Sequence, residues 1–346
     1  MTYINYFFLI IFIFSFNYIL IKQINRIRFI NIIDEDFLKP QAFHKKPIPR
    51  LGGVLLLINY LVFFIYSQTF LLNFWLIIFS IAFTLIGFLD DAKFEKRAKR
   101  KLIYLILAII FMKFFTEISI NNYGINFLNY FTNKNIIFDY LIITLCFLTI
   151  INGSNFIDGF NGLLIIHSII ICLFLLLVEN WSNIYLIFFL ICLIIIFLFN
   201  FPFSKVFLGD SGSYLIGFIL SFFTIEVANN NINVSPIFFA ILLNYLFLEV
   251  IFSFIRKSII LRKNPFLPDN KHLHMLVFKK IQFVNSKFRN PAVSIIINLI
   301  YLTAMLAAYY LKENTYLIKW LFLFLIIFYI SVYLLVNNSF KNEFKK

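Results

Sequence analysis

Long apolar blocks alternate with short polar segments along the whole chain. The blocks are roughly 16 to 22 residues long, which is the length that an α-helix needs to cross a hydrocarbon core of about 30 Å. Eleven blocks can be recognised, at residues 3–21, 51–67, 73–89, 102–117, 136–151, 160–178, 184–200, 211–228, 235–255, 291–311 and 316–336. The pattern therefore predicts an all-α polytopic membrane protein with about eleven transmembrane helices, folded as a single domain over residues 1–346.

Composition supports a membrane protein, because 62% of the residues are hydrophobic and only 13% are charged. Soluble domains carry about 25% charged residues. The first apolar block has no charge before it, and Lys22, Arg26 and Arg28 follow it. A cleaved secretory signal shows the opposite arrangement, with its positive charge first. We therefore expect the first block to remain in the protein as a helix.

The basic residues predict how the chain is oriented. All but four of the 30 Lys and Arg fall in the segments that follow the odd-numbered helices; the exceptions are Lys113, Lys134, Lys312 and Lys319. Positive charge marks the cytoplasmic side of a membrane protein. We therefore expect the N-terminus outside and the C-terminus in the cytoplasm. The net charge of +14 then reflects topology and attraction to anionic lipid and phosphate, and not binding to nucleic acid.

Five polar clusters lie in the loops that this orientation places in the cytoplasm. The loops are 22–50, 90–101, 152–161, 201–210 and 256–290. The clusters are His44 to Gly53, Asp90 to Lys101, Asn152 to Leu163, Phe207 to Ser213, and Asn264 to Met275. Polar groups near membrane depth are costly and tend to mark substrate sites. We therefore expect these five loops to form one active-site face.

The side chains in these clusters favour phosphoryl transfer assisted by a metal ion. Asp90, Asp91, Asp158 and Asp210 are the hard oxygen ligands that Mg²⁺ prefers. The glycine-rich starts of the helices near Gly159 to Gly162 and at 209–213 offer free N–H groups to phosphate oxygens. Lys46, Arg50 and the basic run after Asp91 could neutralise a diphosphate. Phosphoryl transfer needs mainly such positioning and charge stabilisation.

The motifs resemble those of the bacterial polyprenyl-phosphate N-acetylhexosamine-1-phosphate transferases, a family that includes the phospho-MurNAc-pentapeptide transferase. Asn152 to Leu163 meets the family pattern N-x-x-N-x-x-D-G-x-x-G-L, and Phe207 to Ser213 meets F-x-G-D-x-G-S. Asp90 and Asp91 match its Asp pair, and the segment from Pro265 to His274 matches its His-rich loop. Pro47 to Gly53 resembles the N-acetylhexosamine branch more than the peptidoglycan branch. The resemblance covers about residues 44 to 276.

Two positions depart from the family pattern. Met275 stands where many members carry a third His, and Leu105 stands where many carry a Gln after the basic run. These departures concern details of sugar recognition and leave the reaction class unchanged.

The resemblance implies a reaction at the cytoplasmic face of the bacterial inner membrane. Polyprenyl (undecaprenyl) phosphate attacks a UDP-N-acetylhexosamine, UMP leaves, and a polyprenyl-diphospho-sugar remains. This would be the first step of a cell-surface glycan such as the O-antigen of lipopolysaccharide. The implied cofactor is Mg²⁺, for which Mn²⁺ could substitute. Family members can dimerise, so a homodimer stays open.

We assign roles as hypotheses on this basis. Asp210 binds Mg²⁺, Asp90 positions or deprotonates the lipid phosphate, and Asp91 assists either the metal or the base. Asp158 is placed with Asp90 and Asp91 among the catalytic residues and would also bind the nucleotide. The remaining residues would bind substrate: Asn155 the nucleotide, His272 and His274 the diphosphate or the sugar, with Asn152, Gly159, Gly162, Lys46 and Arg50 around them. Asn152 would also hold the start of a local helix.

Two further charged residues are expected to have structural roles. Lys113 would extend outward to water, as long basic side chains near a membrane surface do. Glu249 would pair with Arg256 near the cytoplasmic end of its helix.

Other functions remain as alternatives. A non-catalytic lipid or ion transporter would show related halves and broken helices at the midplane, whereas no repeat is visible and the charges gather at one face. A membrane scaffold would need no carboxylates and glycines on four separate turns. The peptidoglycan-precursor transferase is the third alternative.

Overall fold

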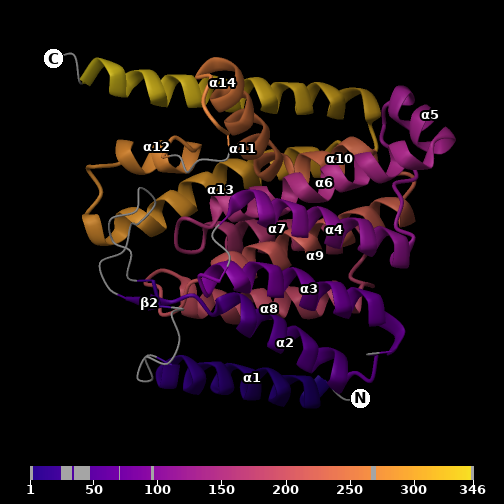
Figure 1. Ribbon diagram of the computed structural model, residues 1–346, viewed down its shortest axis with the longest axis vertical. Helices are drawn as coiled ribbons and strands as arrows, with labels where there is room; N and C mark the ends of the chain where they lie inside the picture. Colours follow the sequence, from indigo (N-terminus) through magenta and orange to yellow (C-terminus); the bar gives the residue numbers. More distant parts are fainter. Residues whose placement is uncertain are drawn as a thin grey trace.

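The computed structural model describes residues 3–24, 33–34, 47–69, 71–94, 97–265 and 270–343. Its helices lie side by side with their axes roughly aligned, and β2 and α12 lie at the same end of the bundle (Figure 1). The first elements are α1 (Tyr3–Ile24), β1 (Ile33–Asp34), β2 (Ile48–Pro49), α2 (Gly52–Tyr66), η1 (Leu71–Asn73), α3 (Phe74–Asp91), α4 (Ala98–Thr116), α5 (Asn126–Lys134) and α6 (Ile136–Ile157). The two strands pair in antiparallel fashion, with Ile33 opposite Pro49.

The second half of the chain continues the same architecture. Its elements are α7 (Leu163–Val178), α8 (Ile184–Asn200), α9 (Gly209–Asn230), α10 (Pro236–Leu242), α11 (Asn244–Ile255), η2 (Arg256–Ile260), α12 (Leu273–Lys280), α13 (Ser286–Tyr310) and α14 (Thr315–Glu343). Each of the eleven predicted blocks overlaps at least one of these helices, which confirms an all-α polytopic membrane protein.

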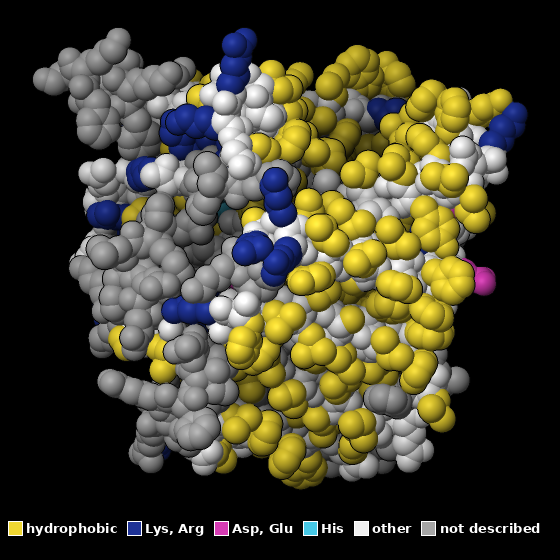
Figure 2. All heavy atoms as spheres, in the orientation of Figure 1, with side chains coloured by type: hydrophobic (Ala, Val, Ile, Leu, Met, Phe, Trp, Pro, Cys, Tyr) yellow, Lys and Arg dark blue, Asp and Glu magenta, His cyan; other side chains and the backbone are white. Residues whose placement is uncertain are grey.

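Length and composition identify fewer membrane spans than there are apolar blocks. Among the described residues, six helices are long and apolar enough to cross a membrane: α1, α3, α6, α9, α13 and α14. The pair α10 and α11 makes a seventh if it is counted as one bent span. The predicted count of eleven spans and the orientation stay predictions. Figure 2 shows most of the visible Lys and Arg toward the side that carries β2 and α12, and hydrophobic side chains over the remainder.

Two predicted boundaries are wrong. The loop predicted at 152–161 is mostly helical, because α6 continues to Ile157. Gly153 lies there against the backbone of Leu246, so that packing on α11 stabilises helix in a stretch of poor helix formers. The block 235–255 is broken at Leu243, where the chain bends by 71°. Apolar residues continue on both sides of this bend, so the pattern could not reveal it.

Helix α9 lies at the centre of the bundle and contacts α2, α3, α6 and α7. It is buried along nearly its whole length. Glycines allow the neighbouring helices to come close: an added Cβ at Gly53 of α2 would lie 2.0 Å from the backbone nitrogen of Gly212, and one at Gly87 of α3 would lie 2.3 Å from the carbonyl oxygen of Asp210. These two contacts hold the polar ends of α2 and α3 against the start of α9.

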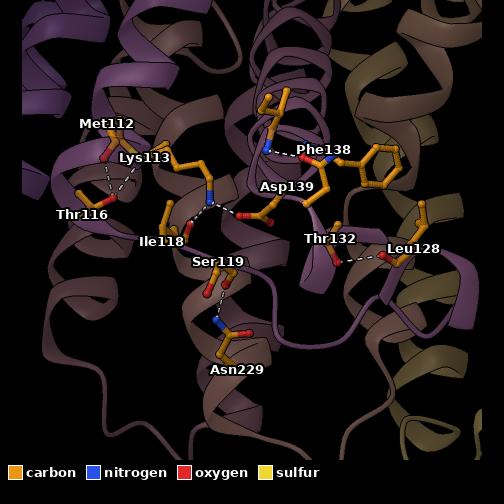
Figure 3. A network of polar contacts seen from close by, with 12 residues as sticks. Met112, Lys113, Thr116, Ile118, Ser119, Leu128, Thr132, Phe138, Asp139 and Asn229 are labelled. Carbon is orange, nitrogen blue, oxygen red and sulfur yellow. Dashed lines mark hydrogen bonds and ion pairs between the residues drawn. The ribbon is translucent and has the colours of Figure 1, made fainter. Parts of the chain in front are cut away.

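The opposite end of the bundle holds a buried ion pair (Figure 3). The Nζ atom of Lys113 in α4 donates to the Asp139 carboxylate of α6 at 2.5 Å and to the carbonyl oxygen of Ile118 at 3.0 Å. The residue is 5% exposed, so the expectation that Lys113 extends outward to water is wrong. A buried ammonium group needs such a partner, and no pattern along the chain indicates that Asp139, on the next long helix, supplies it.

We expect Gly53→Ala to destabilise the protein, because the new Cβ would meet backbone atoms that cannot turn away. Overpacking of this kind costs about 1–3 kcal/mol, so the variant should unfold at a lower Tm in detergent. Gly159→Ala is the matched control, since its Cβ would meet only the His274 side chain, at 3.9 Å. Equal Tm values for the two variants would contradict the close packing of α2 on α9.

Candidate active site

The segment before α2 is fixed to the segment before α9 by backbone hydrogen bonds. Gly52 N–H donates to the carbonyl of Phe207 at 2.8 Å, and Gly53 N–H donates to that of Leu208 at 2.9 Å. In return, Phe207 N–H donates to the carbonyl of Pro49 at 2.9 Å. The predicted clusters around Arg50 and Asp210 therefore lie side by side.

Asp91, the last residue of α3, caps the N-terminus of α9. Its two carboxylate oxygens accept from the backbone N–H groups of Asp210 and Ser211, each at 2.9 Å. Gly209 makes this approach possible: its φ is +72°, and a Cβ there would lie 2.5 Å from the carboxylate. Such a cap satisfies N–H groups that have no partner within the helix, and its negative charge suits the helix dipole.

The Asp91 carboxylate is also near a cation. Arg50 Nη1 lies 3.8 Å from Asp91 Oδ1, and the Arg50 side chain is 29% exposed. The structure thus gives Asp91 a definite capping contact, while its predicted part in catalysis or metal binding stays a prediction. Lys46 lies outside the described residues.

Asp90 and Asp210 bring two carboxyl groups together. Their side chains lie close enough to act on each other, and Lys101 of α4 bonds to the Asp90 carboxylate. The Asp90 side chain is 22% exposed, so this pair can be reached from water. Two adjacent carboxylates repel each other unless a proton or a cation lies between them.

Asp158 follows the last residue of α6 and joins this group. Its carboxylate lies near the backbone N–H of Gly209, and Asp91 and Arg50 are close enough to act on it electrostatically. Burial raises the pKa of Asp158 well above its ordinary value, the Asp91 charge raises it further, and Arg50 opposes this rise.

The remaining residues of the central motif have different surroundings. Asn155 Nδ2 donates to Ser213 Oγ of α9 at 3.4 Å, which joins the motif to the Asp210 segment. Asn152 lies within α6, where its Nδ2 donates to the carbonyl of Leu148, so its predicted place at the start of a helix is wrong. Gly162 precedes α7 with a φ of +75°, and its N–H donates to Asn200 Oδ1. This contact shapes the turn.

His272 and His274 lie on the other side of the central motif. Both are buried, and their rings are parallel with centroids 5.5 Å apart. The His272 ring packs on Phe156 at 4.9 Å and the His274 ring on Phe160 at 5.5 Å. Gly159 faces His274 Nε2. Burial lowers the pKa of His274 to about 3, so its imidazole is neutral at physiological pH.

Glu249 of α11 contacts these histidines and does not pair with Arg256 as expected. One of its oxygens lies 2.8 Å from His272 Nδ1, and the other lies 3.9 Å from His274 Nδ1. Arg256 was expected to be the partner because it is near Glu249 along the chain. The His-rich loop instead folds back onto α11 and brings the two histidines to Glu249.

The carboxylates at the start of α9 suit a magnesium ion better than a metal that needs several protein ligands. Within the described ranges, no three or more His, Cys, Asp or Glu side chains are grouped so as to hold a metal between them. Mg²⁺, however, is usually held by one or two carboxylates, with waters and substrate phosphates completing its shell. The Asp90 and Asp210 carboxylates meet that smaller requirement.

Sequence reasoning missed the individual parts played by Lys101 and Glu249. Lys101 is one of six basic residues in the segment 90–101, and all six were explained together as determinants of membrane orientation. No feature of the sequence distinguished Lys101 from the other five. Glu249 carried a usable signal, because an acidic residue within an apolar block tends to have a function.

Comparison with known proteins agrees with the resemblance of the motifs. Residues 73–228 match the glycosyl transferase family 4 model. The undecaprenyl-phosphate alpha-N-acetylglucosaminyl 1-phosphate transferase of Thermotoga maritima is 30% identical over 238 residues, which cover 69% of this chain and 70% of that protein. A probable undecaprenyl-phosphate N-acetylglucosaminyl 1-phosphate transferase of Bacillus subtilis is 27% identical over 315 residues, or 87% and 84% of the two chains.

A peptidoglycan enzyme is also similar over a shorter stretch. The phospho-N-acetylmuramoyl-pentapeptide-transferase of Dictyoglomus turgidum is 29% identical over 182 residues, which cover 51% of this chain and 58% of that protein. The carboxylate group at the start of α9, the neighbouring histidines and these similarities lead to one conclusion: the chain belongs to glycosyl transferase family 4.

Proposed function

We propose that this protein transfers an N-acetylhexosamine 1-phosphate from a UDP-sugar to polyprenyl phosphate and releases UMP. The observation that carries the proposal is the group of carboxylates at the junction of α3 and α9, with Arg50 and Lys101 beside it. Two relatives whose names state undecaprenyl-phosphate N-acetylglucosaminyl 1-phosphate transfer are similar over 69% and 87% of this chain, which favours N-acetylglucosamine as the sugar.

The proposed reaction exchanges one phosphoanhydride for another. An oxygen of the lipid phosphate attacks the phosphorus that carries the sugar, and the bond from that phosphorus to the UMP oxygen breaks with its electron pair leaving on UMP. Asp90 orients the lipid phosphate and accepts any proton that it carries, and Lys101 fixes the Asp90 carboxylate. Arg50 supplies positive charge to the diphosphate.

The other residues position substrate in this proposal. Asp210 and Asp90 would hold Mg²⁺, which supplies positive charge to the diphosphate when bound. Asp91 keeps the start of α9 in place through its two backbone contacts. Asn155 and Asp158 bind the nucleotide. The active site would face the cytoplasm, where UDP-sugars are made, and the membrane would be the bacterial inner membrane.

Purified protein with undecaprenyl phosphate should release UMP from a UDP-N-acetyl sugar in the presence of Mg²⁺ and stop when EDTA is added. The panel should include UDP-N-acetylglucosamine and UDP-MurNAc-pentapeptide, because a relative of each kind is similar to this chain. Turnover of the pentapeptide substrate alone would replace the proposed sugar. Folded protein that releases no UMP from any donor would contradict the proposed reaction.

Asp90→Asn should lower kcat about 100-fold or more, since a positioned acid–base group contributes about 10²–10⁴-fold. Asp210→Asn should raise the Mg²⁺ concentration needed for half-maximal rate, because it removes one proposed ligand and leaves the proposed base in place. The control is Glu226→Gln, a change of charge on α9 away from these carboxylates. Near-wild-type turnover of Asp90→Asn, or an unchanged Mg²⁺ requirement of Asp210→Asn, would show that the assigned role is wrong.

A further inference from the structure

Glu249 is a carboxylate that the proposed reaction does not use. It lies in the apolar helix α11 and is 1% exposed. A buried charge is costly unless hydrogen bonds satisfy it, and two donors bond to this one. His272 Nδ1 lies 2.8 Å from one oxygen, and the backbone N–H of Leu273 donates to the other at 3.1 Å. The side chains of Tyr245 and Tyr329 lie close to the same carboxylate.

The contacts to His272 and Leu273 fix one ring and the backbone that carries it. Leu273 is the first residue of α12, so its N–H has no partner within that helix. The same carboxylate holds this N–H and the ring of the preceding residue. Contact with a carboxylate keeps a proton on Nδ1, which leaves Nε2 as the atom that can bind another group.

His274 also turns its Nδ1 atom toward this carboxylate. Nδ1 lies 3.9 Å from Glu249 Oε1 and 3.2 Å from the Tyr245 hydroxyl. Because a nearby carboxylate favours a proton on the nitrogen that faces it, His274 Nδ1–H donates to the hydroxyl. His274 Nε2 is then an acceptor, and it is buried without a hydrogen-bond partner among the described residues. It faces Gly159 of the central motif.

We propose that Glu249 is a positioning residue of the transferase. It fixes Nδ1 as the protonated atom of His272 and, together with the Tyr245 hydroxyl, of His274, so that both rings present Nε2 to the sugar nucleotide. This inference rests on the proposed function. It differs from a purely structural role because the effect of Glu249 on turnover passes through the two histidines.

Glu249→Gln separates these two roles. Glutamine keeps the size of the side chain but has only one oxygen that can accept a hydrogen bond. His272 and Leu273 each bond to a different oxygen of Glu249, so their contacts cannot both survive. We expect kcat/KM to fall about 10- to 100-fold, the range found when carboxylates that orient metal-bound histidines are replaced. The control Glu226→Gln should keep wild-type kcat/KM.

A double-mutant cycle tests whether the effect passes through His272. His272→Asn should lower kcat/KM at least as much as Glu249→Gln, and the double variant should match His272→Asn within about twofold. Losses that multiply in the double variant would overturn the proposal, as would wild-type turnover of Glu249→Gln. If Glu249→Gln does not fold, Tyr245→Phe replaces it, and its loss of kcat/KM should vanish in a His274→Asn background.

An NMR measurement keeps this test independent of activity. The chain has 4 His, so protein with ¹⁵N-labelled histidine gives a simple spectrum. The signals that disappear in the His272→Asn variant belong to the His272 ring. Nδ1 of His272 should be protonated in the wild type, and this signal should change in Glu249→Gln but not in Glu226→Gln. An unchanged His272 signal would overturn the positioning role. Wild-type protein that shows the expected tautomer but turns over no donor would overturn the proposed function alone.

Discussion

The contact between the Asp91 carboxylate and the first turn of α9 is the constraint on which the site depends. Asp91 accepts from two N–H groups of α9, and only a glycine at 209, with φ of +72°, leaves room for it. Removing the carboxylate would leave buried N–H groups without partners, at a cost of about 1–3 kcal/mol for each. The same contact sets Asp90 of α3 next to Asp210 of α9. An ordinary helix cap thus brings together the carboxylates that the proposed chemistry requires.

The central motif joins two halves of the site. The carboxylate half is built from α2, α3 and α9, whose close approach needs Gly53 and Gly87. The histidine half is built from α11 and α12 around Glu249. Asp158 contacts the carboxylate half, while Phe156 and Phe160 pack on the histidines. The end of α6 and the turn after it therefore fix the distance between the carboxylates, which suit a metal-bound diphosphate, and the histidine rings, which suit a nucleotide or sugar.

Apolar block length predicted the helices well, because crossing or filling an apolar layer requires a fixed length of helix. It could not predict the bend at Leu243 or the extension of α6 to Ile157, since these depend on packing between helices. The motifs selected the segments that meet, but not the partner of each side chain. Lys113 pairs with Asp139 and Glu249 with His272, across 26 and 23 residues of chain. Such pairings arise from tertiary structure and leave no periodic trace in a single sequence.

We propose that the Asp90 and Asp210 carboxylates hold the metal ion of the site that the two halves enclose. Anomalous diffraction from crystals grown with Mn²⁺ and a UDP-N-acetyl sugar tests this arrangement. We expect an anomalous peak within bonding distance of the Asp210 carboxylate, with the diphosphate beside it and the nucleotide near Asn155. A peak elsewhere on the protein, with the diphosphate bound away from α9, would show that these carboxylates are not the metal site.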